Sequence, residues 1–143
     1  EKLVWNIPFN GLGVASTAGL ESLVSKGDTM PAQLGDTLST DHLLADPQWE
    51  QYVRALMLEL IDVASAKGIA LEPELVDRMI ENTRTMGSYR ASTVVDFENG
   101  RPIELESMFL EPLRQALAAG IAVPHLEALC IVLGKLDRYL PRP

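Results

Sequence analysis

The chain has 143 residues, 47% of them hydrophobic, and its 20 acidic and 12 basic side chains give a formal net charge of −8. This length suits one domain, residues 1–143, with its own core, and the acidic balance disfavours a nucleic-acid partner because it repels the phosphate backbone. No uncharged apolar run approaches the roughly 18 residues that span a membrane, and no signal-peptide pattern opens the chain, so we expect a cytoplasmic protein.

The first segment, KLVWNIPFNGLGV, carries two lines of side chains when it is read as a helix. Apolar residues recur at three- and four-residue steps, while Lys2, Asn6 and Asn10 fall on a second line, roughly 6 Å apart at each step. An ammonium group can donate a proton or stabilise a developing oxyanion, and amides can bind hydroxyl groups. This line indicates recognition of an oxygen-rich small molecule. The alternative is a solvated Lys2 and asparagines that cap a backbone disturbed by Pro8.

The sequence predicts the structure of the next two stretches with different clarity. Residues 15–40 lose the periodicity and interleave glycine and proline with small polar residues, which predicts a loop or excursion with a short helix near 20–24. The clearest helix is predicted over 46–67. Asp46 can cap its start, the following proline suits the first turn, and Gly68 can end it in a left-handed conformation.

The second half of the chain continues in the same pattern. Helices are predicted over 73–86 and 124–140, each beginning at a proline. A further helix is predicted over 105–119, where Pro112 removes a backbone donor and should introduce a kink. The one alternating stretch, 92–97, is short and ends in an Asn-Gly turn signal. The sequence therefore predicts an all-α domain of about six helices packed as a bundle.

A second polar cluster lies in SYRASTVVDFENGRPIELESM, inside otherwise apolar sequence. Ser92, Asp96, Arg101, Glu104 and Glu106 surround a turn. From these residues alone, the cluster is either part of a site or a solvated loop with a capping serine.

The sequence supports neither a metal site nor a dinucleotide-binding loop. His42 and His125 are isolated, Cys130 has no cysteine partner, and no HExxH or CxxC is present, so we expect no metal site and no internal disulfide. The spacing around Cys130 is that of a buried helical residue. The segment NGLG offers GxG without a third glycine or a preceding strand, so this chain is not expected to bind a dinucleotide by itself.

Taken together, these stretches resemble the C-terminal domain of the 2-dehydropantoate 2-reductases, or ketopantoate reductases. The similarity begins with KLVWNIPFNGL, resumes at LLADPQWEQYVRALMLELIDVASAKGI, and continues through SYRASTVVDFENGRPIELESM to LRQALAAGIAVPHLEAL. Its signature is Lys-x3-Asn-x3-Asn followed at long range by Ser-x3-Asp-x7-Glu. The resemblance implies an all-α bundle of the 6-phosphogluconate dehydrogenase C-terminal-like type.

The resemblance also implies an activity and roles for single residues. Family members transfer hydride from NADPH to the 2-keto group of ketopantoate, giving pantoate for pantothenate and coenzyme A synthesis. On the matching positions, Lys2 would be the general acid, and Asn6 and Asn10 would hold the hydroxyl and carbonyl side of the substrate. Ser92 would bind the carboxylate. Glu104 would accept a hydrogen bond from the substrate hydroxyl and help to orient Lys2.

Several features leave alternatives open. The amino-terminal Rossmann domain that binds NADPH is absent from this chain, and the family commonly forms homodimers, so both are expected partners. Ser88-Tyr89-Arg90 replaces an Asn-rich lead-in to the serine, which leaves the 2-keto acid open. An alternative of another class is a helical interaction module that kept the fold and lost catalysis. A reductase domain must gather Lys2 and Glu104 at one cleft, whereas an interaction module need not.

Overall fold

The computed structural model describes residues 2–139, and within this range it contains helices and no strand. In chain order the α-helices are α1 (Lys2–Ala15), α2 (Leu20–Val24), α3 (Thr40–Ala45), α4 (Pro47–Ala66), α5 (Glu74–Arg84), α6 (Ser92–Glu98), α7 (Glu111–Ala118) and α8 (Pro124–Tyr139). A 3-10 turn, η1 (Ser16–Ala18), follows α1, and a π-helical turn, η2 (Leu105–Leu110), leads into α7. The all-α prediction is confirmed. The predicted number of about six helices is too low, because the described residues contain eight α-helices.

The helix ends that carry local signals are confirmed. Asp46 caps α4 by accepting a hydrogen bond from the Gln48 N–H at 2.9 Å, and Gly68 beyond its end has a φ of 85°. Gly87 likewise follows α5 with a φ of 68°. The short helix near 20–24 is also present, as α2. Position 140, at the predicted end of the last helix, lies outside the described residues.

The structure adds two helices that the sequence did not predict and overturns one prediction. The alternating stretch 92–97 forms helix α6, because Val94 and Phe97 are buried at a helical three-residue step. The region before residue 46 holds a second short helix, α3, where none was predicted. Pro112 does not kink a continuous helix over 105–119: it lies in the first turn of α7, where a missing N–H is tolerated, and the irregular turn η2 precedes it.

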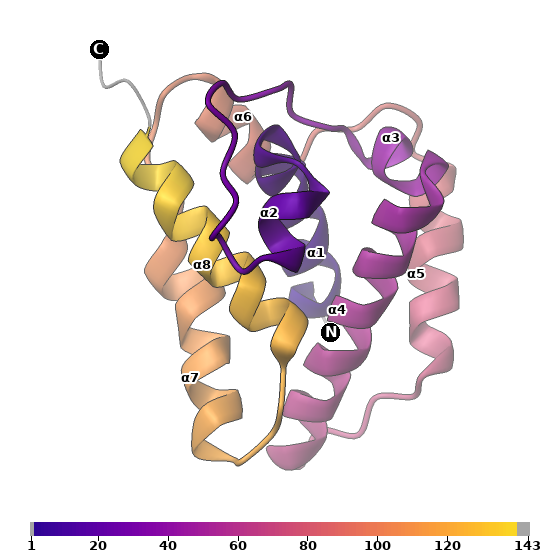
Figure 1. The fold of residues 1–143 in the computed structure, drawn as a ribbon. Helices are drawn as coiled ribbons and strands as arrows, with labels where there is room; N and C mark the ends of the chain where they lie inside the picture. Colours follow the sequence, from indigo (N-terminus) through magenta and orange to yellow (C-terminus); the bar gives the residue numbers. More distant parts are fainter. Residues whose placement is uncertain (1, 140–143) are drawn as a thin grey trace.

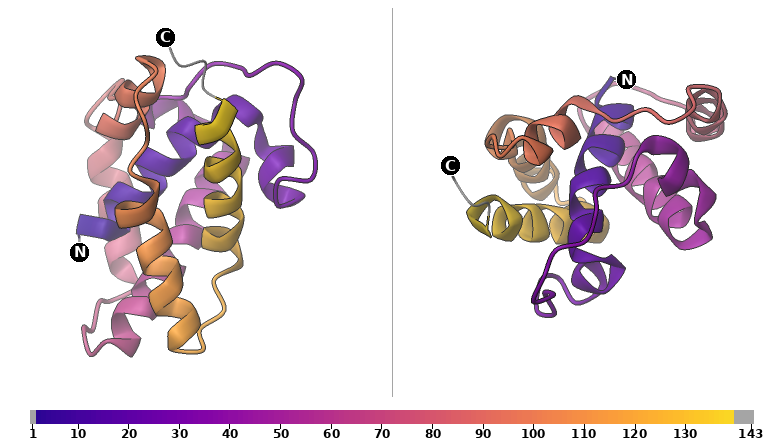
Figure 2. Two further views of the ribbon diagram at one scale, coloured as in Figure 1. Left: turned by 90° about the vertical axis from the view of Figure 1, so that its left-hand side faces the viewer. Right: turned by 90° about the horizontal axis from the view of Figure 1, so that it is seen from above.

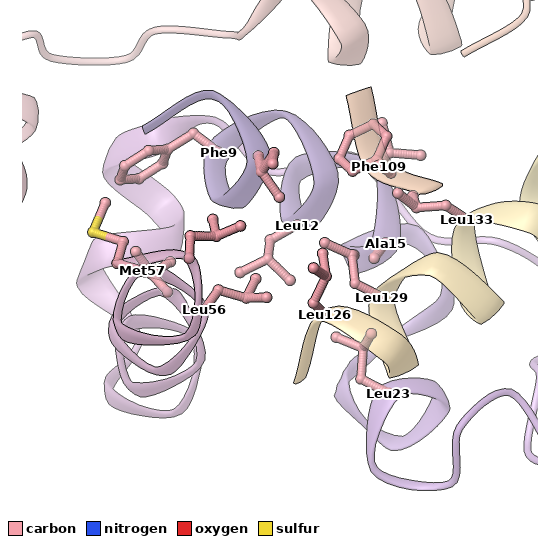
Figure 3. Packing of buried hydrophobic residues seen from close by; sticks show 14 of the residues in the cluster. Phe9, Leu12, Ala15, Leu23, Leu56, Met57, Phe109, Leu126, Leu129 and Leu133 are labelled. Atoms are coloured by element: carbon pink, nitrogen blue, oxygen red, sulfur yellow. The ribbon is translucent and has the colours of Figure 1, made fainter. Parts of the chain in front are cut away.

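Helix α1 runs through the middle of the bundle, and α4, α6 and α8 pack against it (Figures 1 and 2). Every residue from Ile7 to Ala15 is buried, which explains why this helix is apolar almost all round. Figure 3 shows the Leu12 side chain between Leu56 of α4 and Leu129 of α8. The core therefore forms around the same helix that carries the polar line at its start.

Two glycines allow the neighbouring helices to approach α1. A Cβ atom at Gly11 would lie 2.7 Å from Leu129 Cδ2 and 3.0 Å from Phe109 Cε1. A Cβ at Gly13 would overlap the Val94 side chain of α6. The GxG pattern of the sequence therefore lies inside a buried helix and serves close packing, since only glycine leaves room for these contacts.

The start of α8 is capped from another helix. Glu59 of α4 is only 8% exposed, and its carboxylate accepts hydrogen bonds from the backbone N–H groups of His125 at 3.0 Å and Leu126 at 2.9 Å. His125 Nδ1 lies 2.7 Å from the same carboxylate. The Tyr52 hydroxyl donates to the His125 carbonyl at 3.0 Å. Because a carboxylate at a helix N-terminus meets both free N–H groups and the positive end of the dipole, this contact fixes α8 against α4.

The single thiol is buried, as predicted. Cys130 donates a hydrogen bond to the Phe109 carbonyl at 3.4 Å, and burial raises the pKa of its thiol to about 12. No three His, Cys, Asp or Glu side chains gather as a metal site among the described residues. Within the same residues, no helix has the length and apolar character needed to cross a membrane.

Candidate functional site

The first turn of α1 reaches the surface of the bundle, with α5 on one side and α6 on the other (Figure 2, right). Lys2 is exposed there, and Asn6 is half-buried. Both belong to a largely apolar depression of about 360 Å³ beside the end of α5, whose lining residues are Lys2, Trp5, Asn6, Met79, Asn82, Thr83 and Met86. The predicted general acid and the first amide therefore share one concave surface.

Aromatic contacts hold this turn in place. Trp5 Nε1 donates a hydrogen bond to Thr83 Oγ1 at 2.8 Å. The Trp5 ring lies 4.9 Å from the ring of Phe9 and 6.1 Å from the ring of Tyr89, measured between centroids. Trp5 was not predicted to matter, although an aromatic residue with a polar N–H beside the Lys-Asn line is a signal for such an anchor. These contacts fix where Lys2 and Asn6 project relative to α5.

Asn10, one turn further along α1, is 3% exposed. Its Oδ1 accepts a hydrogen bond from the Thr93 N–H at 2.8 Å, and its Nδ2 donates to the Asn6 carbonyl at 2.8 Å. The first contact joins α1 to the start of α6, one residue after the exposed Ser92. The structure thus brings Asn10 and the Ser92 turn together.

Glu104 is exposed and immediately precedes η2. Its carbonyl accepts a hydrogen bond from the Met108 N–H at 3.1 Å, which places Met108 one turn later. Met108 in turn contacts α6, because its Sδ lies 4.0 Å from Thr93 Oγ1. Glu104 therefore comes from a segment that packs beside the first turn of α6.

The second polar cluster separates into two groups. Asp96 forms an ion pair with Arg101 at 3.0 Å, and Glu106 pairs with Arg114 at 2.6 Å. These side chains stabilise the turn after α6 and the start of α7. Ser92 is the exposed first residue of α6 and makes no capping hydrogen bond, so the capping serine of the alternative interpretation is not observed, while the exposed ion pairs agree with a solvated surface.

The side chains of Lys2, Asn6, Ser92 and Glu104 make no hydrogen bond or ion pair with any other residue that the structure describes. Their polar groups remain available to a ligand. The same observation means that Lys2 and Glu104 do not pair directly with each other. Asn10 differs from these four, since both ends of its amide are engaged within the protein.

The residues that line the depression beside α5 include Lys2 and Asn6 but not Ser92 or Glu104, so the structure places only the first two of these side chains in one hollow. Residues 32–137 match the family model for the C-terminal domain of ketopantoate reductase, "Ketopantoate reductase PanE/ApbA C terminal". The chain belongs to the ketopantoate reductase family and corresponds to its C-terminal domain. The predicted family is confirmed.

Individual relatives agree with this assignment. The chain is 31% identical over 137 residues to a 2-dehydropantoate 2-reductase of Nostoc sp., covering 96% of this chain and 37% of that protein. It superposes with a TM-score of 0.79 on the crystal structure of 2-dehydropantoate 2-reductase from Methylococcus capsulatus, at 30% identity over 99% of this chain and 42% of that one. The enzyme from Geobacter metallireducens gives a TM-score of 0.73 at 36% identity, over 94% and 38% of the two chains. The chain thus spans about two fifths of the length of these relatives.

Proposed function

We propose that this chain is the substrate-binding domain of an NADPH-dependent 2-dehydropantoate 2-reductase, which reduces ketopantoate to pantoate on the route to pantothenate and coenzyme A. One observation carries the proposal. Of the five predicted site residues, the four with unpaired side chains are a lysine, an asparagine, a serine and a glutamate, the groups that such a reduction needs. Ser92 and Glu104 lie within the residues that match the family model, 32–137, whereas Lys2 and Asn6 lie before them.

The chain's own residues would act on the substrate as follows. Lys2 donates a proton to the keto oxygen as charge develops on it. Glu104 accepts a hydrogen bond from the substrate hydroxyl and helps to orient the ammonium group of Lys2. Ser92 binds the carboxylate, and Asn6 and Asn10 hold the hydroxyl and carbonyl side.

NADPH would supply the hydride and would be held mainly outside this chain. Gly11 and Gly13, the nearest approach to a nucleotide motif, are buried within α1, so these residues do not fit a nucleotide loop. The relatives are long enough for a further domain beside the matched part. We therefore propose an N-terminal Rossmann domain as the partner that binds NADPH.

We also propose that the domain forms a homodimer. Leu117 of α7 is 60% exposed and Ile131 of α8 is 37% exposed, which leaves apolar surface on the two last helices. Sedimentation at high protein concentration tests this, and a clean monomer would contradict it.

Activity measurements test the catalytic proposal. The complete protein containing this domain should oxidise NADPH, followed by its absorbance, faster with ketopantoate than with other 2-keto acids. Lys2→Ala should lower kcat by roughly 10²–10⁴-fold, the usual contribution of a positioned general acid. Lys26→Ala is a matched control, because that exposed lysine pairs with Glu127 elsewhere on the surface.

Two results would contradict this proposal. If Lys2→Ala kept kcat within a few-fold of the parent, the general-acid role would be wrong. If no 2-keto acid were reduced, the alternative of a helical module without catalysis would be favoured. Preference for another 2-keto acid would keep the reductase and change its substrate.

A further inference from the structure

The segment that joins α5 to α6 crosses beside the start of α1 on its way to Ser92 (Figure 2, right). One residue at the start of α3 holds two of its carbonyl groups. The Thr40 N–H donates to the Tyr89 carbonyl at 2.8 Å, and the Thr40 hydroxyl donates to the Gly87 carbonyl at 3.3 Å. The Tyr89 ring takes no part in these bonds, so they remain when its side chain is changed.

The Tyr89 ring adds to an apolar surface beside the predicted general acid. The residue is 42% exposed, and its ring centroid lies 6.1 Å from that of Trp5. Trp5 and Met86, which is 45% exposed, line the depression that also contains Lys2 and Asn6. Ligand pockets combine such an apolar lining with a few polar groups that fix the orientation of the ligand. Apolar side chains that are open to solvent beside unpaired polar groups therefore indicate contact with the apolar part of a ligand.

The proposed roles account for the polar atoms of ketopantoate but not for its methyl groups. Lys2 is assigned to the keto oxygen, Asn6 to the hydroxyl and carbonyl side, and Ser92 to the carboxylate. Carbon 3, which carries two methyl groups, lies between the keto carbon and the carbon that bears the hydroxyl. Because methyl groups are stabilised by leaving water, they need an apolar surface near Lys2 and Asn6.

We propose that Tyr89 is a specificity-determining residue, whose ring packs with Trp5 against the substituents on carbon 3 and favours 2-keto acids that are branched there. The inference rests on the proposed function and concerns the part of the substrate that the polar residues do not bind. Tyr89 lies in the stretch Ser88-Tyr89-Arg90, where this chain departs from the Asn-rich lead-in of the resemblance. An amide side chain offers hydrogen bonds, whereas a tyrosine ring offers a large apolar face.

A pair of substrates that differ only at carbon 3 tests the inference in the complete enzyme. 4-Hydroxy-2-oxobutanoate keeps the carboxylate, keto and hydroxyl groups of ketopantoate and lacks both methyl groups. The parent enzyme should prefer ketopantoate. Tyr89→Ala should lower the ratio of the two kcat/KM values roughly 5- to 20-fold, the effect of two methyl groups losing contact with an apolar surface, with little change for the unbranched acid. Tyr89→Phe keeps the ring and should keep the ratio.

Ile69→Ala is the matched control, because it removes an exposed apolar side chain beyond the end of α4 and should leave the ratio unchanged. An equal loss of kcat/KM for both acids in Tyr89→Ala would show a purely structural role and overturn the inference. An unchanged ratio in that variant, a lowered ratio in Tyr89→Phe, or a parent enzyme without preference would overturn it as well, and each of these results leaves the proposed reduction intact. If the parent reduced neither acid, the proposed function would fail, and this inference with it.

Discussion

Replacing Glu59 should destabilise the domain more than any surface change of the same size. Its carboxylate is nearly buried and accepts from two backbone N–H groups at the start of α8, with His125 Nδ1 at 2.7 Å. Hydrogen bonds to a charged group contribute about 1.5–3 kcal/mol each, and a helix dipole adds about 0.3–1 kcal/mol. Allowing for relaxation and water entry, Glu59→Ala should lower the free energy of unfolding by about 3–5 kcal/mol.

Urea denaturation of the 143-residue chain, followed by circular dichroism at the helical band, measures this change. Glu59→Gln should lose about half as much, since the amide keeps one acceptor oxygen but no charge. Glu127→Gln is the matched control, because it lies in the same first turn of α8 but its ion pair with Lys26 is exposed, so about 1 kcal/mol or less is expected. If Glu59→Ala lay within 1 kcal/mol or so of that control, the buried cap would be worth little and the reasoning would fail.

Further predictions concern packing, reactivity and pH. Gly13→Ala should lower the free energy of unfolding by about 1–3 kcal/mol through steric overlap with α6, whereas Gly134→Ala, whose Cβ would lie 3.8 Å from its nearest neighbour, should be neutral or slightly stabilising in the same urea titration. Cys130, with a thiol pKa of about 12, should resist iodoacetamide at mildly alkaline pH until the chain is unfolded, and rapid labelling of the native chain would contradict its burial. The hydrogen bond from Arg84 at 2.6 Å lowers the pKa of Glu50, so the carboxylate stabilises the fold above its unfolded pKa, and this contribution is lost as the pH falls through the folded value. Glu50→Gln should therefore cost about 1 kcal/mol near neutral pH and almost nothing in strong acid, and an equal loss at both would refute the linkage.

Much of the candidate site was predictable because its signals are local. The four-residue steps of Lys2, Asn6 and Asn10 need only helical geometry to place them on one side of α1. The Ser-x3-Asp-x7-Glu spacing made Ser92 and Glu104 candidates, but it did not predict the helix that presents the serine. A short alternating run such as 92–97 fits a strand or a helix equally well until its packing partner is known.

The partners of these residues were not predictable from the sequence. Nothing near Asn10 in the chain indicates that its amide meets the Thr93 N–H, and nothing near Ala91 indicates that α6 is capped from α1. Glu59 likewise caps α8 from α4. The two N–H groups that it accepts from lie 66 and 67 residues later in the chain. In each case the sequence predicts a polar group at the surface, and the group becomes a buried hydrogen-bond acceptor only because two helices pack together.

The sequence by itself determined the helical class, the ends of helices such as α4 and α5, the burial of Cys130 and the residues that resemble a reductase site. These follow from side-chain periodicity and from caps that act within a few residues of their own position. The tertiary structure alone decided that the GxG pattern serves packing, that α6 is a helix, and that Asn10 is occupied while Lys2, Asn6, Ser92 and Glu104 keep unpaired side chains among the described residues. The physical reason is that burial and hydrogen-bond satisfaction depend on which elements come into contact, and local sequence does not specify that.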